Sequence, residues 1–342
     1  MSHPPEFDPN AAAAPDSGAF GLPFTPEQAR VVLVPVPFEA TTSYGGGAAD
    51  GPAAIREASK QVDLFDLDTG RPYAAGIAML DEPADVRAWN DEAKALAAPI
   101  VASGGADADP ATLPRIDALC AQMNDWVYRT TRDWLAQDKI VGIVGGDHST
   151  PFGAIAAYAE RYPQLGVLHL DAHADLRDAY EGFTWSHASI MFNVLAHVPN
   201  VRKLVQVGIR DFSEAEYQLI QAQPARIRTF FDADLQRARF AGRSWQDQVD
   251  EIVAALPQHV YLSWDIDGLQ PTFCPHTGTP VPGGLDFAQA VALLEGLVRG
   301  GKRIVGFDLN EVAPGPDGDE WDGNVGARLL YKMIGWTLRS QG

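Results

Sequence analysis

The 342-residue sequence is poor in cysteine, in positive charge and in long apolar runs. Its two cysteines, Cys120 and Cys274, are too few for a disulfide framework. Lys and Arg total 26 against 45 Asp and Glu, and this net charge of −19, without basic clusters, argues against nucleic-acid binding. No segment reaches about 18 uninterrupted apolar residues, and no signal peptide precedes the first predicted strand. We therefore expect a cytoplasmic protein without a membrane partner.

The common nucleotide-binding motifs are also missing. A glycine-rich loop, Tyr44–Gly47, follows an apolar segment at 31–36, and such a loop can cradle phosphate. However, the loop contains neither G-x-G-x-x-G nor the Gly-Lys-Ser/Thr of a P-loop, so the pattern disfavours nucleotide binding. Its glycines permit unusual backbone angles, and Pro52 is placed to begin the next helix.

Alternating strand and helix patterns predict an α/β fold with a mainly parallel central sheet and helices on both faces. Residues 1–24, rich in Pro, Ala and Asp, are expected to form an arm that is mobile or lies over a neighbouring subunit, and 25–342 a single domain. Residues 66–110 give no clear pattern. The expected strands are 31–36, 140–144, 166–170, 203–208, 259–265 and 303–311; the expected helices are 113–137, one opening at Pro151 with Thr150 as its cap, 186–197, 213–222, 245–256, 286–298 with Asp286 as its cap, and 323–338.

The most informative stretch is 166–175, where an apolar strand is followed by Asp171, His173 and Asp175. Residues two apart on an extended chain project to the same side, so these three side chains can face one centre. A carboxylate–imidazole–carboxylate set suits a divalent metal ion. The alternative is a solvated loop, so further ligands are needed. His169, inside the strand, is expected to be a satisfied core residue or a support for a ligand.

Other predicted strands end in the same kind of residue. His148 follows one strand, Asp265 and Asp267 end another, and Glu311 ends a third. The carboxyl ends of parallel strands share one rim of the sheet, where sites usually lie. For any one of these residues a helix cap or a solvated acid is the better explanation, but their common position on one rim favours a site.

Charge predicts what this rim binds. Four carboxylates at positions 171, 175, 265 and 267 would take up protons without a counter-charge, whereas two divalent ions would balance them. Mixed imidazole and carboxylate ligands suit Mn²⁺, Ni²⁺ or Zn²⁺ better than Ca²⁺. Two ions about 3.5–4 Å apart can lower the pKa of a shared water, so hydrolysis is the expected chemistry.

Five ordered motifs resemble the ureohydrolase family of arginase, agmatinase, guanidinobutyrase and guanidine hydrolase. The resemblance runs from about residue 30 to the C-terminus, through Gly145–Ser149, Asp171–Asp175, Ser263–Gly268, Thr277–Pro280 and Asp308–Glu311. It implies a three-layer α/β/α fold, trimers or hexamers, possibly with a paralogous subunit, and hydrolysis of a guanidino carbon to urea and an amine. It also implies one ion held by His148, Asp171, Asp175 and Asp265, and a second held by Asp171, His173, Asp265 and Asp267.

The resemblance also implies roles for further residues. Asp175 would orient the attacking hydroxide, Glu311 would pair with the guanidinium, and His187 would pass a proton to the leaving amine. A solvent-facing histidine at a helix N-terminus is the alternative for His187. Thr279 is expected to line the guanidinium end of the pocket, and Tyr44 to form part of another wall.

The segment around Trp185 departs from the arginase and agmatinase patterns, and we expect Trp185 to narrow the pocket. This favours a small substrate: guanidine, an N-alkylated guanidine or a biguanide, with Mn²⁺ or Ni²⁺ as the metal. The alternatives are agmatine, 4-guanidinobutyrate or formimidoylglutamate as substrate, or a non-catalytic subunit of a mixed oligomer. The latter would be favoured by a lost ligand, and none is lost. Gln270, Cys274 and His276 receive no role.

Overall fold

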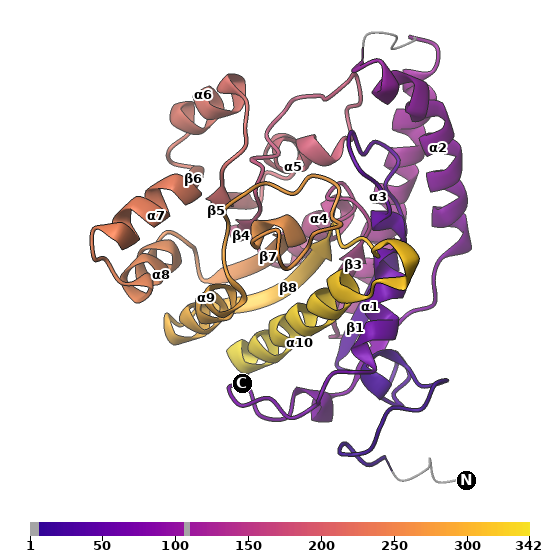
Figure 1. The fold of residues 1–342 in the computed structure, drawn as a ribbon, viewed down its shortest axis with the longest axis vertical. Coiled ribbons are helices and arrows are strands. Elements are labelled where there is room, and N and C mark those ends of the chain that lie inside the picture. Colours follow the sequence, from indigo (N-terminus) through magenta and orange to yellow (C-terminus); the bar gives the residue numbers. More distant parts are fainter. Residues whose placement is uncertain (1–6, 106–109) are drawn as a thin grey trace.

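An eight-stranded sheet, parallel throughout, forms the middle of the molecule (Figure 1). The computed structural model describes residues 7–105 and 110–342. The strand order is β2-β1-β3-β8-β7-β4-β5-β6. The strands are β1 (Val31–Val36), β2 (Ile77–Met79), β3 (Ile140–Gly145), β4 (Leu165–Leu170), β5 (Val201–Ile209), β6 (Ile227–Phe231), β7 (His259–Asp265) and β8 (Arg303–Asn310).

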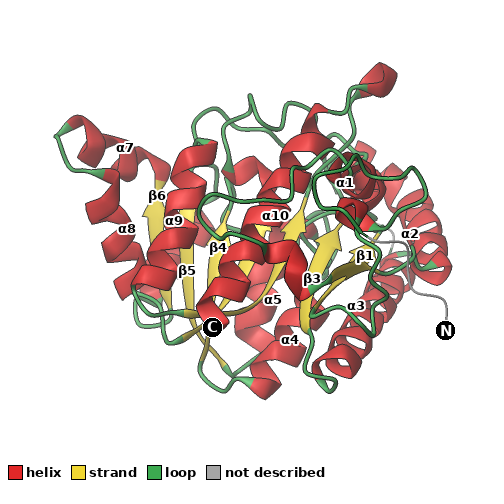
Figure 2. Cartoon of the chain, turned by 90° about the horizontal axis from the view of Figure 1, so that it is seen from below, coloured by secondary structure: helices red, strands yellow, loops and turns green. Residues whose placement is uncertain are grey.

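Helices cover both faces of this sheet (Figure 2). Side chains of α1, α7, α8, α9 and α10 share one apolar core with the sheet, and those of α2, α3, α4, α5 and α6 share the other. The helices are α1 (Gly51–Ser59), α2 (Ala84–Ala102), α3 (Leu113–Leu135), α4 (Phe152–Arg161), α5 (Ile190–His197), α6 (Glu214–Ala222), α7 (Asp232–Phe240), α8 (Trp245–Ala254), α9 (Phe287–Arg299) and α10 (Trp321–Gln341). The predicted three-layer α/β/α fold is thus confirmed.

The central strands form because they are apolar on both sides. Every residue of β1, β3 and β4 is buried, as expected for strands covered by helices on both faces. Asp286 caps α9 as predicted, because its side chain accepts a hydrogen bond from the backbone N–H of Gln289. No helix in the described part of the chain is both long and apolar enough to cross a bilayer.

Several elements differ from the sequence prediction. Strand β2 is apolar but has only three residues, too few to mark a strand in the sequence, and the apolar run of β6 is interrupted by the exposed Arg228. Helix α2 lies in the segment without a clear pattern and contains Pro99 near its C-terminal end. Thr150 does not cap α4: its hydroxyl donates to the Asp147 carbonyl and also bonds Asn310, and the helix begins two residues later.

The N-terminal segment is partly anchored to its own chain. Phe20 and Leu22 are buried, the ring of Phe20 lies 5.0 Å from that of Tyr331 in α10, and the Phe20 N–H donates to Ser59 in α1. Residues 19–22 are therefore neither free nor dependent on a neighbouring subunit for burial. Residues 1–6 lie outside the described part, and the boundary at residue 24 stays a prediction.

The four middle strands, β3, β8, β7 and β4, are consecutive neighbours in the sheet. They are the strands whose ends carry the predicted site residues: His148 after β3, Glu311 after β8, Asp265 at the end of β7 and Asp171 after β4. Because all strands are parallel, these ends meet on one rim. The motifs lie far apart in the sequence, but the strands that carry them are neighbours in the sheet.

Candidate active site

One group of donor atoms surrounds the imidazole of His148. Its Nδ1 lies 2.9 Å from Asp171 Oδ2, 3.4 Å from Asp175 Oδ2 and 3.5 Å from Asp265 Oδ2. All four side chains are nearly inaccessible to solvent. The turn after β3, the end of β4, the loop beyond it and the end of β7 thus bring one nitrogen and three carboxylate oxygens to a single centre.

A second group lies on the other side of Asp171. His173 Nδ1 is 3.4 Å from Asp171 Oδ1 and 3.1 Å from Asp267 Oδ2. Asp171 therefore presents one oxygen to each group. Asp265 differs, because its Oδ1 accepts a hydrogen bond from the Asp267 N–H and only Oδ2 faces His148. The structure brings together all six residues predicted to hold metal.

These separations fit divalent ions. Ligand atoms about 2.1 Å from an ion lie about 3.0 Å apart at octahedral and about 3.4 Å apart at tetrahedral angles. The measured spacing around His148 Nδ1 and His173 Nδ1 runs from 2.9 to 3.5 Å. The donor set and its spacing therefore suit one ion in each group, with Asp171 shared between them.

Electrostatics support the same interpretation. Burial, followed by the charge of Asp171, raises the pKa of Asp175 well above its ordinary value. Burial and the charges of Asp267 and Asp171 raise the pKa of Asp265 in the same way. Burial alone would lower the pKa of His148, but hydrogen bonds to Asp171 and Asp265 raise it well above 6.5. Without cations, the cluster therefore holds extra protons, and divalent ions would displace them.

The orientation of the His148 ring is set by its contact with Ser263 in β7. Its Nε2 lies 2.9 Å from Ser263 Oγ, and Ser263 Oγ donates to Asp308 Oδ1 at 3.0 Å. Because the serine proton points to Asp308, the serine oxygen accepts from His148 Nε2–H. Nδ1 is then left to face the carboxylates, as a metal-binding imidazole requires. Burial raises the pKa of Asp308 only to about 6, so this carboxyl is largely ionised at neutral pH.

His187 and Glu311 lie beside the metal-binding groups. His187 Nδ1 is 3.7 Å from Glu311 Oε1, and its Nε2 is 3.3 Å from Ser43 Oγ. Burial lowers the pKa of His187, but the interaction with Glu311 and the charge of Asp147 outweigh burial and raise it. The predicted alternative of a solvent-facing histidine is not what the structure has, because only 12% of the His187 side chain is exposed.

Two of these acidic residues have unusual backbones. Asp175 has φ 54° and Glu311 has φ 62°, both in the left-handed region that side chains with a Cβ seldom adopt. The Glu311 N–H donates to the Gly146 carbonyl, and Glu311 Oε1 accepts from the His148 N–H. Such conformations persist where surrounding contacts over-determine them, which is common at functional sites.

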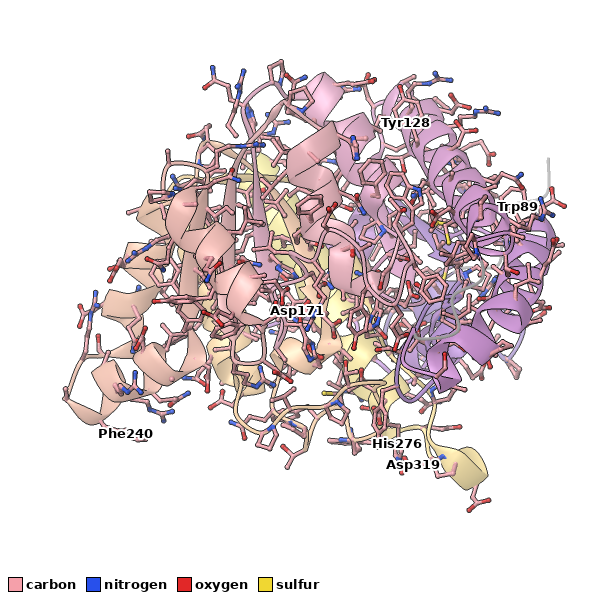
Figure 3. The ribbon with its side chains drawn as sticks, turned by 90° about the horizontal axis from the view of Figure 1, so that it is seen from above. Trp89, Tyr128, Asp171, Phe240, His276 and Asp319 are labelled. Atoms are coloured by element: carbon pink, nitrogen blue, oxygen red, sulfur yellow. The ribbon has the colours of Figure 1, made fainter. Side chains whose placement is uncertain are left out.

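A cavity of about 230 Å³ opens beside the cluster. His173, Asp175, His187, Thr279 and Tyr44 are among the residues that line it. The Thr279 hydroxyl lies 3.5 Å from Asp267 Oδ2, whereas the Tyr44 side chain is 74% exposed at the mouth. Figure 3 shows Asp171 in the middle of the molecule, whereas His276, which is hydrogen-bonded to Asp322, lies near an edge.

Trp185 packs outside this set of lining residues. Its ring instead packs against Phe152, 4.9 Å away, and His197, 6.0 Å away, beside the apolar core on one face of the sheet. This packing against α4 and α5 gives no support to the expectation that Trp185 narrows the pocket, which stays a prediction.

Sequence reasoning missed most of the cavity mouth. The additional lining residues are Ser43, Arg177, Tyr180, Ala188, Asp211, Phe212 and Glu216. One signal was available: Asp211 follows β5, the neighbour of β4, just as the other rim residues follow their strands. The rest lie on loops and a helix whose approach to the rim depends on tertiary packing.

Comparison with known proteins now settles the family. The sequence model of the arginase family matches residues 29–335. The chain belongs to the arginase family. Among curated proteins, it is 34% identical over 319 residues to the N(1)-aminopropylagmatine ureohydrolase of Thermus thermophilus, covering 92% of this chain and 93% of that protein. It is 31% identical over 333 residues to the agmatinase of Photorhabdus laumondii, covering 93% and 92%.

A solved structure supports the same assignment. Proclavaminate amidinohydrolase from Streptomyces clavuligerus superposes with a TM-score of 0.73 at 25% identity, over 97% of this chain and all of that one. This arginase-family chain is thus a ureohydrolase, an enzyme that hydrolyses a guanidino compound. The family's binuclear metal site has its counterpart in the His and Asp cluster described above. The predicted family, fold and enzyme class are confirmed.

Proposed function

We propose that the protein hydrolyses the guanidino group of a cationic aminoalkylguanidine, agmatine or an N-substituted agmatine, to urea and an amine. The observation that carries this substrate class is the charge at the cavity mouth. Two similar proteins act, by name, on N(1)-aminopropylagmatine and agmatine, which agrees with the alternative substrate considered from the sequence. The small-guanidine hypothesis loses its main argument because Trp185 does not line the cavity.

The mouth leaves one carboxylate without a cationic partner. Arg177 is the only lysine or arginine among the described residues that line the cavity. Its Nε lies 3.7 Å from Glu216 Oε2, and its guanidinium lies over the Tyr180 ring. Arg177 and Glu216 therefore neutralise each other. Asp211 is exposed and has no ion pair within the described residues. Asp211, with the aromatic rings of Tyr44 and Phe212 nearby, suits an ammonium group.

The inner residues suit the guanidinium end. Glu311 is buried beside the cluster, and a carboxylate offers two acceptors to the planar donor fork of a guanidinium. The six residues His148, Asp171, His173, Asp175, Asp265 and Asp267 would hold two divalent ions, Mn²⁺ or Ni²⁺. Such ions, when bound, supply a water of lowered pKa. Asp175 would accept a hydrogen bond at the reacting centre, and Thr279 would border the guanidinium.

His187 is the proton donor in this proposal. It lines the cavity, is held between Ser43 and Glu311, and has a pKa that the interaction with Glu311 raises against the opposing effect of burial. A protonated imidazole there would deliver its proton to the departing amine. Protonation of the amine prevents its return to the carbon and so drives the reaction towards urea.

A substrate panel tests this proposal. Purified protein loaded with Mn²⁺ or with Ni²⁺ is assayed for urea release from agmatine, N(1)-aminopropylagmatine, 4-guanidinobutyrate, arginine, methylguanidine and guanidine. We expect kcat/KM to be at least about tenfold higher for the two cationic amines than for the others, a preference of about 1.4 kcal/mol. Greater turnover of guanidine or methylguanidine would restore the small-substrate hypothesis, and greater turnover of 4-guanidinobutyrate would reverse the charge argument.

The oligomeric state, a paralogous subunit and the cellular location remain predictions. Homo-oligomeric assembly as a trimer or hexamer is checked by light scattering coupled to size-exclusion chromatography, with the metal-loaded full chain. A mixed complex with a paralogous subunit would appear as a second chain after purification from the native host. The cytoplasmic location likewise follows only from the sequence expectation.

A further inference from the structure

A row of buried polar side chains crosses the apolar sheet directly beneath the site. Gln206 in β5, His169 in β4, Ser263 in β7 and Asp308 in β8 are register partners in successive strand pairs. All four are fully buried. Four polar residues side by side in a sheet core would destabilise the fold unless each found its hydrogen-bond partner, so their arrangement calls for a reason.

The amide of Gln206 has one possible orientation. Its Nε2 lies 2.7 Å from the Ala174 carbonyl oxygen, which can only accept, so the NH₂ group must point there. Gln206 Oε1 then accepts from the hydroxyl of Thr229, its register partner in β6, at 2.9 Å. The second proton of Gln206 Nε2 is left for His169 Nδ1, 3.0 Å away.

This orientation fixes the protonation of His169. Because Nδ1 accepts a hydrogen bond from Gln206, it carries no proton, and the single ring proton resides on Nε2. His169 Nε2 lies 2.8 Å from Asp171 Oδ2, the carboxylate oxygen that also faces His148 Nδ1 at 2.9 Å. His169 is therefore a hydrogen-bond donor to a residue shared by both donor groups.

We propose that His169 is a positioning residue, held by Gln206 in its Nε2–H form, which orients Asp171 for the two ions and is not itself a metal ligand. His169 lies within ligand distance of the cluster formed by His148, Asp171 and Asp175, so its ring could be taken for a fourth ligand there. Its hydrogen bonds exclude that role, because one nitrogen holds a proton and the other accepts from Gln206.

The consequence concerns the shared carboxylate. Without the His169 proton, Asp171 Oδ2 would lose this hydrogen bond, and the backbone N–H of His173 on Oδ1 would be left to hold the carboxylate against rotation. Groups that orient metal ligands in this way typically change metal affinity or activity by about 10–100-fold when removed. The inference rests on the proposed two-ion site and assigns the polar row a task within it.

Two substitutions at one position test the donor. His169→Phe keeps a planar ring but removes the proton, whereas His169→Gln offers an amide N–H at a similar distance. Metal content and Mn²⁺ affinity are measured by elemental analysis and by chelator competition, with kcat and KM alongside. We expect His169→Phe to lower the affinity for at least one of the two Mn²⁺ ions by about 10–100-fold. His169→Gln should recover this affinity to within about fivefold of wild type.

The variant Gln206→Glu distinguishes a positioning role of His169 from a role as a metal ligand. A carboxylate at 206 would accept from Nδ1–H, so the Nε2 proton would leave or the ring would become cationic. Either change weakens Mn²⁺ binding if His169 serves Asp171. If His169 were a ligand through Nε2, a carboxylate on Nδ1 would strengthen its donor power and raise Mn²⁺ affinity. A rise in affinity, or unchanged affinity in His169→Phe, overturns the proposal.

A matched control is His259→Phe. His259 is a half-buried histidine at the opposite end of neighbouring strand β7, where its ring packs on Tyr162. It should leave Mn²⁺ affinity unchanged, and thermal unfolding of every variant shows that the fold is retained. If wild-type protein binds no Mn²⁺ or Ni²⁺, the two-ion site itself fails. If wild type binds two ions and His169→Phe binds them equally well, only the role of His169 fails.

Discussion

The metal-binding cluster and the cavity mouth lie within one site but are built differently. Asp171, with the carboxylates around it, is buried at the ends of the middle strands and engaged by several hydrogen bonds. Tyr44, Asp211 and Phe212 are exposed, lie on connecting loops and make few polar contacts in the described structure. The cluster is fixed by the sheet, whereas the mouth is carried by segments that can vary while the sheet is kept.

This difference assigns separate tasks to the two regions. Side chains held on rigid strands and supported from below can keep donor atoms at the spacing that metal ions require. Side chains on exposed loops can change charge or shape at little cost to the fold, so they suit discrimination among substrates. Reaction type should therefore depend on the cluster, and substrate choice on the mouth. Substitutions in the two regions should change different kinetic constants.

The largest effect is expected from Asp265→Ala. Asp265 is buried, faces His148 and braces Asp267 through a backbone hydrogen bond, so its loss disturbs both donor groups. We expect kcat/KM to fall by about 10³-fold or more, which corresponds to about 4 kcal/mol, for every guanidino substrate. Exposed Asp133→Ala in α3 is the control. Full turnover in Asp265→Ala, with normal metal content, would contradict the cluster's role.

The cluster could be predicted from the sequence because strand ends are easy to recognise. Asp171, His173 and Asp175 follow an apolar run interrupted only by His169, and parallel strands necessarily bring such ends to one rim. Nothing comparable marks the mouth. Arg177 and Glu216 are 39 residues apart and meet only because α6 folds back over the loop after β4. Trp185 shows the limit of motif comparison: the departure of its segment from the arginase and agmatinase patterns favoured a pocket residue, whereas its ring packs against Phe152 in α4.

Metal removal should also affect stability in a pH-dependent way. The pKa values of Asp175 and Asp265 are raised by burial and neighbouring carboxylates, and that of Asp147 is raised to about 6. In the metal-free protein, raised pKa values stabilise the fold at low pH, and this stability is lost as the pH rises from about 4 through the raised values. Bound cations offset the loss.

The metal-dependent gain in stability should therefore be larger at pH 7.5 than at pH 5. With free Mn²⁺ about a thousandfold above its Kd, the gain at pH 7.5 should reach about 4 kcal/mol. Thermal unfolding with added Mn²⁺ and with chelator, at both pH values, measures it. Asp265→Ala should show little gain at either pH. An equal gain for wild type at the two pH values would mean that metal binding releases no protons from the cluster.

His187→Asn tests the boundary between the two regions. His187 touches Glu311 on the inner side and Ser43 on the outer side. We expect kcat to fall by about 10²-fold, with KM and metal content nearly unchanged, because a proton donor is lost but no ligand. In wild type the rate should fall as the pH rises through the raised pKa of His187, and this alkaline fall should vanish in the variant. Ser43→Ala should give a smaller decrease in kcat.

The smallest effect is expected at the mouth, from Asp211→Asn. An exposed charge pair contributes about 0.2–1 kcal/mol, so KM for agmatine should rise about two- to fivefold while kcat is kept. Methylguanidine, which lacks the distal ammonium, should be unaffected, and the difference between the substrates should shrink as ionic strength increases. If Asp211→Asn impaired both substrates equally, Asp211 would act on the site's structure. Substrate choice would then have to come from the buried region as well, and the separation of tasks would no longer hold.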